Sequence, residues 1–463
     1  MNTATKLHPD DVRAAFSRAL SDMYKTEVPQ YGTLLELVAD INAEVIRRDG
    51  PLSTGPHADE ERQRLGVERH GAIRLGTAEE LATMRRLFAV MGMVPVGYYD
   101  LSVAGVPVHA TAFRTTDEAS LRRNPFRVFT SLLRLDLIDD VALRERAAAI
   151  LERRDIYTAR CRALIAIAER EGGLDAAQAA EFVAQALETF RWHHDATVDA
   201  DTYRELRSKH PLIADVVCFK GPHINHLTPR VLDIDAAQAA MHGRGMKAKD
   251  SIEGPPRRGC PILLRQTSFL ALEEPIRFVG AQGDGTHTAR FGEIEQRGCA
   301  LTPAGRERYD ALLQQSREAG KTAPDKGRAL AETFAAFPDD LATLHSEGLA
   351  YVRWQVPAER LASRERPAPG QSAAELLAGG WLAIEPLIYE DFLPVSAAGI
   401  FRSNLGSEGQ AAYDGGGNRG AFERDLGAPV ADEFALYEAT EQQSLQAALA
   451  RLAGAEATST QAA

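Results

Sequence analysis

Three residues that lie far apart in the chain, His70, His226 and Glu293, carry side chains that bind metals. Two imidazoles and one carboxylate form the smallest facial ligand set for non-haem Fe(II), and they leave three positions open for substrate and oxygen. The spacing, 156 positions from His70 to His226 and 67 from His226 to Glu293, matches no local metal motif. We therefore expect a site that the fold assembles from distant segments.

Each of the three residues lies in a segment typical of a strand: VERHGAIRLG, FKGPHINHLTPR and ARFGEIEQRG. His223 and His226 are three positions apart, so on a strand only one of them points inward. Glu293 and Glu295 are two positions apart and share a face. Two carboxylates on an inward face repel each other unless a cation or metal takes up the charge. Glu295 therefore stays open as an alternative third ligand.

Two arginines near these segments could bind an anionic substrate. Arg74 follows His70 by four positions, on the same face of a strand and about 13 Å away. Arg402 ends the apolar segment AAGIF. Arginine is suited to a bidentate grip on a carboxylate. Alone, either arginine is typical of a surface ion pair, but together with the metal-binding residues they suggest an acidic substrate.

Composition excludes several classes of protein. The net charge is 53 − 65 = −12, so a basic face for nucleic acid is not expected. The N-terminus has no apolar leader core, and no apolar run approaches the roughly 18 residues of a membrane span. The four cysteines lie far apart without CxxC pairing, which favours reduced thiols in a cytoplasmic protein.

The hydrophobic pattern predicts an α+β architecture with one main sheet. Helical patterns cover most of the first 50 residues, a long insertion at about 139–211, and residues 305–319, 326–345 and 433–452. We expect one elaborated catalytic domain over residues 1–455 and a disordered tail over 456–463. Strand patterns occur at 94–113, 126–138, 212–219, 260–271, 287–297, 349–356 and 381–405.

The segments HGAIR, GPHINHLTPR, FGEIEQRGxALTPxGRxxYD and GIFRSNL resemble the signature segments of the 2-oxoadipate dioxygenase/decarboxylases. The resemblance runs from about His70 to Leu405. These Fe(II) enzymes have a vicinal-oxygen-chelate-like core and are distantly related to 4-hydroxyphenylpyruvate dioxygenase. The resemblance thus implies a central curved β-sheet that holds the metal and is surrounded by helices with a large helical insertion.

The resemblance also implies the site. It makes His70, His226 and a glutamate of FGEIEQRG the iron ligands. Arg74 and Arg402 become catalytic residues that contact the substrate carboxylate. The hydroxyphenylpyruvate enzymes carry a pattern like F-F-E-x-hydrophobic-Q-R, which places the ligand at Glu293. The position of Glu295 is apolar in those relatives, so the alternative remains.

The implied activity converts 2-oxoadipate and O₂ to 2-hydroxyglutarate and CO₂ in lysine catabolism. The partners are then a small 2-oxo dicarboxylic acid, which lies against His70, His226, Arg74 and Arg402, and O₂. The cofactor is Fe(II). Two other classes remain open: a Zn²⁺- or Mn²⁺-dependent lyase or isomerase of the same superfamily, and a non-catalytic 2-oxo acid binder.

Overall fold

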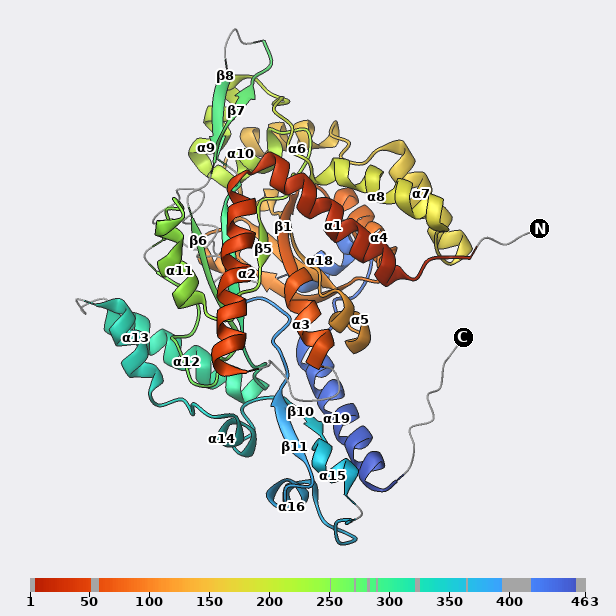
Figure 1. Ribbon diagram of the computed structural model, residues 1–463. Coiled ribbons are helices and arrows are strands. Elements are labelled where there is room, and N and C mark those ends of the chain that lie inside the picture. The colour runs from red at the N-terminus through yellow and green to blue at the C-terminus, as the bar shows by residue number, and fades with distance from the viewer. Residues whose placement is uncertain are drawn as a thin grey trace.

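A five-stranded mixed sheet lies at the centre of the chain (Figure 1). The computed structural model describes residues 5–50, 58–249, 251–269, 272–280, 284–288, 290–320, 325–363, 365–393 and 418–454. The strand order is β2-β3-β4-β1-β5. The strands span Arg69–Leu75 (β1), Val94–Asp100 (β2), Val108–Arg114 (β3), Arg127–Leu133 (β4) and Leu227–Pro229 (β5).

The pairing of β1 brings distant parts of the chain together. β1 runs parallel to β4 and antiparallel to β5, and His70 lies opposite Thr228. Past β5, Arg230 forms a parallel bridge with Glu295 of β9 (Gly292–Arg297). β9 itself pairs with β6 (Leu264–Phe269). Segments around residues 70, 226 and 293 are therefore neighbours in space.

The two faces of the sheet belong to two different apolar clusters. Ile73, Leu75 and Val128 belong to a cluster that includes residues of the N-terminal helices. Ala72 and Phe129 belong to the cluster on the opposite face. Side chains alternate along a strand, so His70, Ala72 and Arg74 share this second face. The sequence pattern thus places His70 and Arg74 of β1 on the same side of the sheet.

Helices surround the sheet (Figure 1). α1 packs against α8, and α2 packs against α11. The helices outside the insertion are α1 (Pro9–Glu27), α2 (Gln30–Asp49), α3 (Ala58–Val67), α4 (Ala78–Ala89), α5 (Glu118–Arg123), α11 (Ile234–Gly243), α12 (Pro303–Gly320), α13 (Lys326–Phe334), α14 (Leu341–Ser346), α15 (Ala358–Ala362), α16 (Ala373–Ala378), α18 (Arg419–Leu426) and α19 (Glu433–Leu452).

Five helices fill the segment between β4 and β5, where the sequence predicts a helical insertion. They are α6 (Val141–Glu152), α7 (Ala159–Glu171), α8 (Ala176–Phe190), α9 (Ala200–Lys209) and α10 (Pro211–Val217). The prediction of a strand at 212–219 is wrong, because α10 occupies most of it. Pro211 starts the helix, and Nδ1 of His210 accepts the Leu212 amide at 3.1 Å. A short apolar run does not distinguish a buried strand from a buried helix.

Two further pairs of strands form small antiparallel sheets. β7 (Glu273–Arg277) pairs with β8 (Asp284–Thr288), and β10 (Val352–Gln355) pairs with β11 (Ala383–Pro386). β10 also contacts α19 at the lower end of the molecule in Figure 1. Two short 3₁₀ turns, Ser102–Ala104 and Leu135–Leu137, complete the list. No helix of the described part is both long and apolar enough to cross a membrane.

Candidate metal centre

His70 lies on β1 and is buried, with 1% of its surface exposed. The residue after it must be glycine. A Cβ on Gly71 would lie 2.5 Å from the Ile224 side chain and 3.1 Å from the backbone oxygen of His226. This close approach lets the 223–226 segment pass directly beside β1. His70 therefore provides a candidate ligand, and Gly71 beside it allows the close approach of the segment that carries His226.

His226 lies one residue before β5 rather than within a strand, and it is also buried. Its Nδ1 lies 2.9 Å from Oγ1 of Thr228, which in turn donates to Oε1 of Glu293 at 2.9 Å. The Thr228 hydroxyl has one proton and gives it to Glu293, so toward His226 it acts as an acceptor. His226 then carries its proton on Nδ1, and Nε2 keeps a lone pair for a metal.

Glu293 is fully buried on β9. Gly292 before it is required by packing, since a Cβ there would lie 1.7 Å from the ring of Phe269. Oε1 of Glu293 accepts hydrogen bonds from Thr228 and from Nε2 of Gln266, the latter at 3.0 Å. Oε2 of Glu293 has no hydrogen-bond partner among the described residues. A buried carboxylate oxygen without a partner is costly, and a bound cation would satisfy it.

The three side chains form one cluster. Each of His70, His226 and Glu293 offers a ligand atom, and these atoms all lie within 4.8 Å of one another. Nε2 of His70 is 3.0 Å from Oε1 of Glu293. Two atoms bound about 2.1 Å from one ion at right angles lie about 3 Å apart. The donor set, its burial and its spacing therefore fit a divalent metal, and the described part of the chain contains no other such group.

The electrostatics of the two histidines differ. Burial lowers the pKa of His226 to about 4, which outweighs the attraction of Glu293. Burial also acts to lower the pKa of His70, but the carboxylates of Glu295 and Glu293 outweigh it and raise that pKa above 6.5. Burial acts to raise the pKa of Glu293, whereas His226 and His70 lower it overall. The cluster thus contains an ionised carboxylate and a neutral His226.

Glu295, the alternative ligand, lies on the other side of His70. Its Oε2 is 2.9 Å from Nδ1 of His70, although the two are not aligned for a regular hydrogen bond. Both of its oxygens face Arg297, at 2.9 Å from Nε and 2.8 Å from Nη2. Glu293 and Glu295 therefore share a face, as expected, but they contact opposite nitrogens of one imidazole.

Arg74 lies on the same face of β1 as His70 and is buried. It forms an ion pair with Asp215 of α10. Asp215 also contacts two histidines, with its Oδ1 at 2.8 Å from Nε2 of His287 and 3.5 Å from Nε2 of His223. His223 has a φ of +28°, which is unusual for a residue other than glycine. It belongs to this second polar group and points away from the metal cluster.

Arg402 lies outside the described residues. The described residues break off at Leu393 and resume at Asn418, and Phe392 near this break contacts the site. The ring of Phe392 lies 5.0 Å from the ring of His70, and the ring of Phe291 lies 4.8 Å from that of His226. These aromatic rings shield the cluster from water.

Sequence reasoning did not identify Thr228, Gln266, Asp215 or Phe392. For Thr228 a signal existed, because it follows His226 by two positions and extended residues two apart share a face. Asp215 was hidden in the run interpreted as a strand. Gln266 and Phe392 reach the cluster only through tertiary structure, so no local pattern marks them.

Comparisons with known proteins agree with this geometry. The sequence profile of the 2-oxoadipate dioxygenase/decarboxylase family matches residues 16–404. The 2-oxoadipate dioxygenase/decarboxylase of Pseudomonas putida is 58% identical over 446 residues, covering 95% of this chain and 96% of the relative. That of Escherichia coli is 57% identical over 441 residues, with 95% and 98% covered.

Solved structures give the same result. The hydroxyglutarate synthase from Pseudomonas putida in complex with 2-oxoadipate superimposes with a TM-score of 0.88. The two share 56% sequence identity, and the alignment covers 97% of this chain and 99% of that one. With its length matched almost from end to end, the chain belongs to the 2-oxoadipate dioxygenase/decarboxylase family.

Proposed function

We propose that this chain is a non-haem Fe(II) enzyme that converts 2-oxoadipate and O₂ to 2-hydroxyglutarate and CO₂. The observation that carries the proposal is the buried cluster of His70, His226 and Glu293 in a chain of this family. The reaction balances, because C₆H₈O₅ and O₂ give C₅H₈O₅ and CO₂. The substrate supplies its own 2-oxo acid group, so no second 2-oxo acid is consumed.

The choice of iron rests on the donor set. Two histidines and one carboxylate with open positions are typical of Fe(II) oxygenases, whereas structural zinc sites are closed by four protein ligands. When bound, the iron would supply activation of O₂ next to the 2-oxo acid group. Its ligands would be His70, His226 and Glu293, and the buried position of all three favours exclusion of bulk water.

The other side chains would bind and orient the substrate. A dicarboxylate that faces the metal with its 2-oxo acid end has a second charge at its far end. We assign Arg74 and Arg402 to the substrate carboxylates, with His70 and His226 also against the substrate. Asp215 would hold Arg74 in place, and the ring of Phe392 would close one side beside His70.

The same proposal extends to the architecture and the cellular role. We infer that the central sheet is of the vicinal-oxygen-chelate type. His70 lies on β1 of the mixed sheet, His226 lies beside β5, and Glu293 lies on β9, which bridges to the residue after β5. We further propose that the chain is one catalytic domain over residues 1–455, with the helices of 139–211 as an insertion. A cytoplasmic place in lysine breakdown would suit this reaction.

The test is metal loading under anaerobic conditions followed by measurement of oxygen uptake. We expect Fe(II) to restore activity with 2-oxoadipate, with one O₂ consumed for each CO₂ and each 2-hydroxyglutarate formed. Zn²⁺ and Mn²⁺ should occupy the site without oxygen uptake. Turnover without O₂ in the Zn²⁺- or Mn²⁺-loaded protein would instead indicate a lyase or isomerase.

A further inference from the structure

His70 has a carboxylate at each ring nitrogen. Nε2 lies 3.0 Å from Oε1 of Glu293, and Nδ1 lies 2.9 Å from Oε2 of Glu295. A metal ion can take only one of these nitrogens, and the other must then carry the proton. The identity of the ligand nitrogen is therefore decided by which carboxylate is free to bind the ion.

The surroundings of the two glutamates differ. Glu293 accepts only from the neutral donors Thr228 and Gln266, besides its contacts with the histidines. Glu295 faces Arg297 with both oxygens, at 2.9 and 2.8 Å, and Nη1 of Arg127 lies 3.9 Å away. Nε of Arg297 donates to Oε1, and Nη2 lies within ion-pair distance of Oε2, so this guanidinium neutralises the Glu295 carboxylate. Glu293 thus keeps its charge for an ion, whereas Glu295 is already paired.

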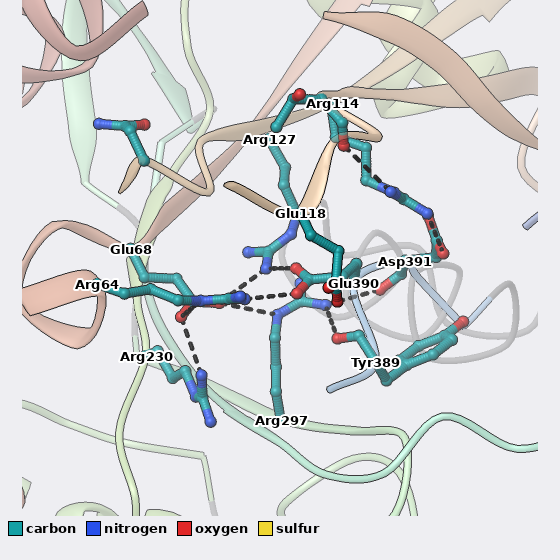
Figure 2. Close-up of polar contacts among 12 residues, drawn as sticks. Arg64, Glu68, Arg114, Glu118, Arg127, Arg230, Arg297, Tyr389, Glu390 and Asp391 are labelled. Carbon is teal, nitrogen blue, oxygen red and sulfur yellow. Dashed lines mark hydrogen bonds and ion pairs between the residues drawn. The ribbon is translucent and has the colours of Figure 1, made fainter. Parts of the chain in front are cut away.

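Arg297 is held in place by backbone groups on the side of its guanidinium away from Glu295. Its Nη1 donates to the backbone oxygens of Tyr389 and Asp391, at 2.8 and 3.0 Å. Figure 2 shows its guanidinium beside these carbonyl groups. Arg114 grips the Asp391 carboxylate at 2.7 and 2.9 Å. The whole arrangement is buried, so Arg297 has little freedom to leave Glu295.

A second part of the same buried network does not touch His70. Glu68 contacts Arg127 at 2.8 Å, Arg230 at 3.0 Å and Arg64 at 3.3 Å (Figure 2). It is as buried as Glu295, and it is also a glutamate held by arginines. Loss of its charge should disturb the network, including Arg297, whose Nε lies 3.9 Å from Oε1 of Glu68, but it removes no partner of the His70 ring. Glu68 is therefore a matched control for Glu295.

We propose that Glu295, held by Arg297, is a positioning residue for the metal: with an ion on Nε2, the ring of His70 aligns its Nδ1 proton with the neighbouring carboxylate of Glu295, which keeps the Nε2 lone pair directed at the ion. The inference rests on the proposed function, because it needs a metal at the cluster. Such a carboxylate partner fixes the orientation of a ligating imidazole and makes it more basic. Thr228 does the same for His226 with a neutral oxygen.

The test is the metal affinity of the full chain after its metal has been removed with a chelator. Co²⁺ is titrated against a coloured competing chelator in the wild type and in Glu295→Gln, Arg297→Lys, Glu68→Gln and His70→Ala. We expect Glu295→Gln to weaken Co²⁺ binding by about 10- to 100-fold. Arg297→Lys, which keeps the charge but loses the two-point grip, should weaken it less. Glu68→Gln should lower the melting temperature and leave the affinity unchanged.

The outcomes separate the two proposals. Wild-type affinity in Glu295→Gln overturns the inference but leaves the metal site in place. Equal losses of affinity in Glu295→Gln and Glu68→Gln mean a general structural effect, and they also overturn it. If the wild type binds no Co²⁺, or His70→Ala binds it as well as the wild type, the proposed function fails.

A measurement on the unaltered protein covers the case in which Glu295→Gln does not fold. Nitrogen NMR of the Zn²⁺-loaded chain, labelled with ¹⁵N-histidine, reports the protonated nitrogen of each ring. The His70→Ala variant identifies the signals of His70. A proton on Nδ1 and metal on Nε2 support the inference, and the reverse arrangement overturns it.

Discussion

Arg74 of β1 and Asp215 of α10 form an ion pair in which both side chains are almost completely buried. Burial acts to raise the pKa of Asp215, but Arg74 and the two neighbouring histidines hold it well below its usual range. Arg74 is also close enough to contribute to the lowered pKa of His226. Asp215 therefore fixes a cation within electrostatic reach of the metal cluster.

Arg74→Ala should reduce kcat/KM for 2-oxoadipate by roughly 10²- to 10³-fold, since loss of one partner of a buried charge pair costs about 2–5 kcal/mol. Metal content should not change. Because the variant leaves Asp215 buried without its cation, it should also melt earlier, and Arg74→Ala/Asp215→Ala separates the two effects. If the double variant recovers both stability and activity, Arg74 does not bind substrate.

Arg402→Ala tests the distal carboxylate directly. We expect a similar loss in kcat/KM, roughly 10²- to 10³-fold, with unchanged metal content. For at least one of the two arginine variants, the loss should be much smaller with a 2-oxo acid of similar length that lacks the second carboxylate. Equal losses on mono- and dicarboxylates would mean that neither arginine recognises the distal acid.

Removal of any of the three predicted ligands should abolish turnover. His70→Ala, His226→Ala and Glu293→Gln should each lose bound iron, measured by elemental analysis, while circular dichroism stays that of the folded chain. His109→Gln changes a buried histidine that belongs to no metal cluster and should keep its iron. A full iron content in one of the three variants removes that residue from the site.

The sequence correctly predicted helices whose periodicity or end residues are typical of a helix. α19 spans Glu433–Leu452 as its pattern predicts, and α4 begins at Ala78 after Thr77, which accepts the Glu80 amide. The apolar run of α10 was wrongly predicted as a strand. In so short a run the periodicity does not distinguish helix from strand, and the flanking residues decide between them. Pro211 was the available signal for a helix start.

The site was predictable in its residue types and only partly in its geometry. That Glu293 and Glu295 share a face follows from the period of a strand. Which nitrogen of His70 each contacts depends on the bridge between Arg230 and Glu295, which sets how β9 lies beside β5. A contact between residues this far apart in the chain comes from packing, and no spacing in the sequence encodes it.

Thr228→Val should weaken metal binding. The variant keeps the shape of the side chain but removes the oxygen that contacts Nδ1 of His226 and Oε1 of Glu293. The two lost hydrogen bonds are worth about 1 kcal/mol each, or about 2 kcal/mol together, so we expect a loss of roughly 30-fold in Co²⁺ affinity. Thr302→Val, which also removes a hydroxyl that donates a hydrogen bond but is no part of the cluster, is the control. An unchanged affinity would show that Nε2 of His226 is directed at the metal without help from Thr228.

Acid should destabilise the metal-free protein well before its carboxylates are protonated. Burial lowers the pKa of His109, His210 and His226 to about 4 in each case. In the unfolded chain these groups have a pKa of about 6.5, so between pH 6.5 and about 4 the unfolded state binds more protons and stability falls as the pH falls.

Two other groups act differently in this range. His70, whose pKa is raised, changes stability only above pH 6.5, where its contribution is lost as the pH rises. Glu253, whose pKa burial raises to about 7, opposes the three histidines, because its protonated form favours the folded state below that pH. The three histidines less Glu253 contribute a net uptake of about two protons on unfolding, or about 3 kcal/mol per pH unit. Burial also lowers the pKa of His223 and His345, which adds to this slope, and raises the pKa of Glu433 and Glu441, which opposes it.

Urea unfolding of the metal-free chain at several pH values between 6.5 and 4.5 measures this slope. We expect His109→Gln, which cannot take up the proton, to reduce the slope by about 1.4 kcal/mol per pH unit. His242→Gln changes an exposed histidine at the end of α11 and should leave the slope as it is. A stability that stays constant from pH 6.5 to 4.5 would contradict the assignment of these three histidines as neutral in the folded protein. Metal should steepen the dependence, because His70 and His226 must both be unprotonated at the ligand nitrogen to bind it.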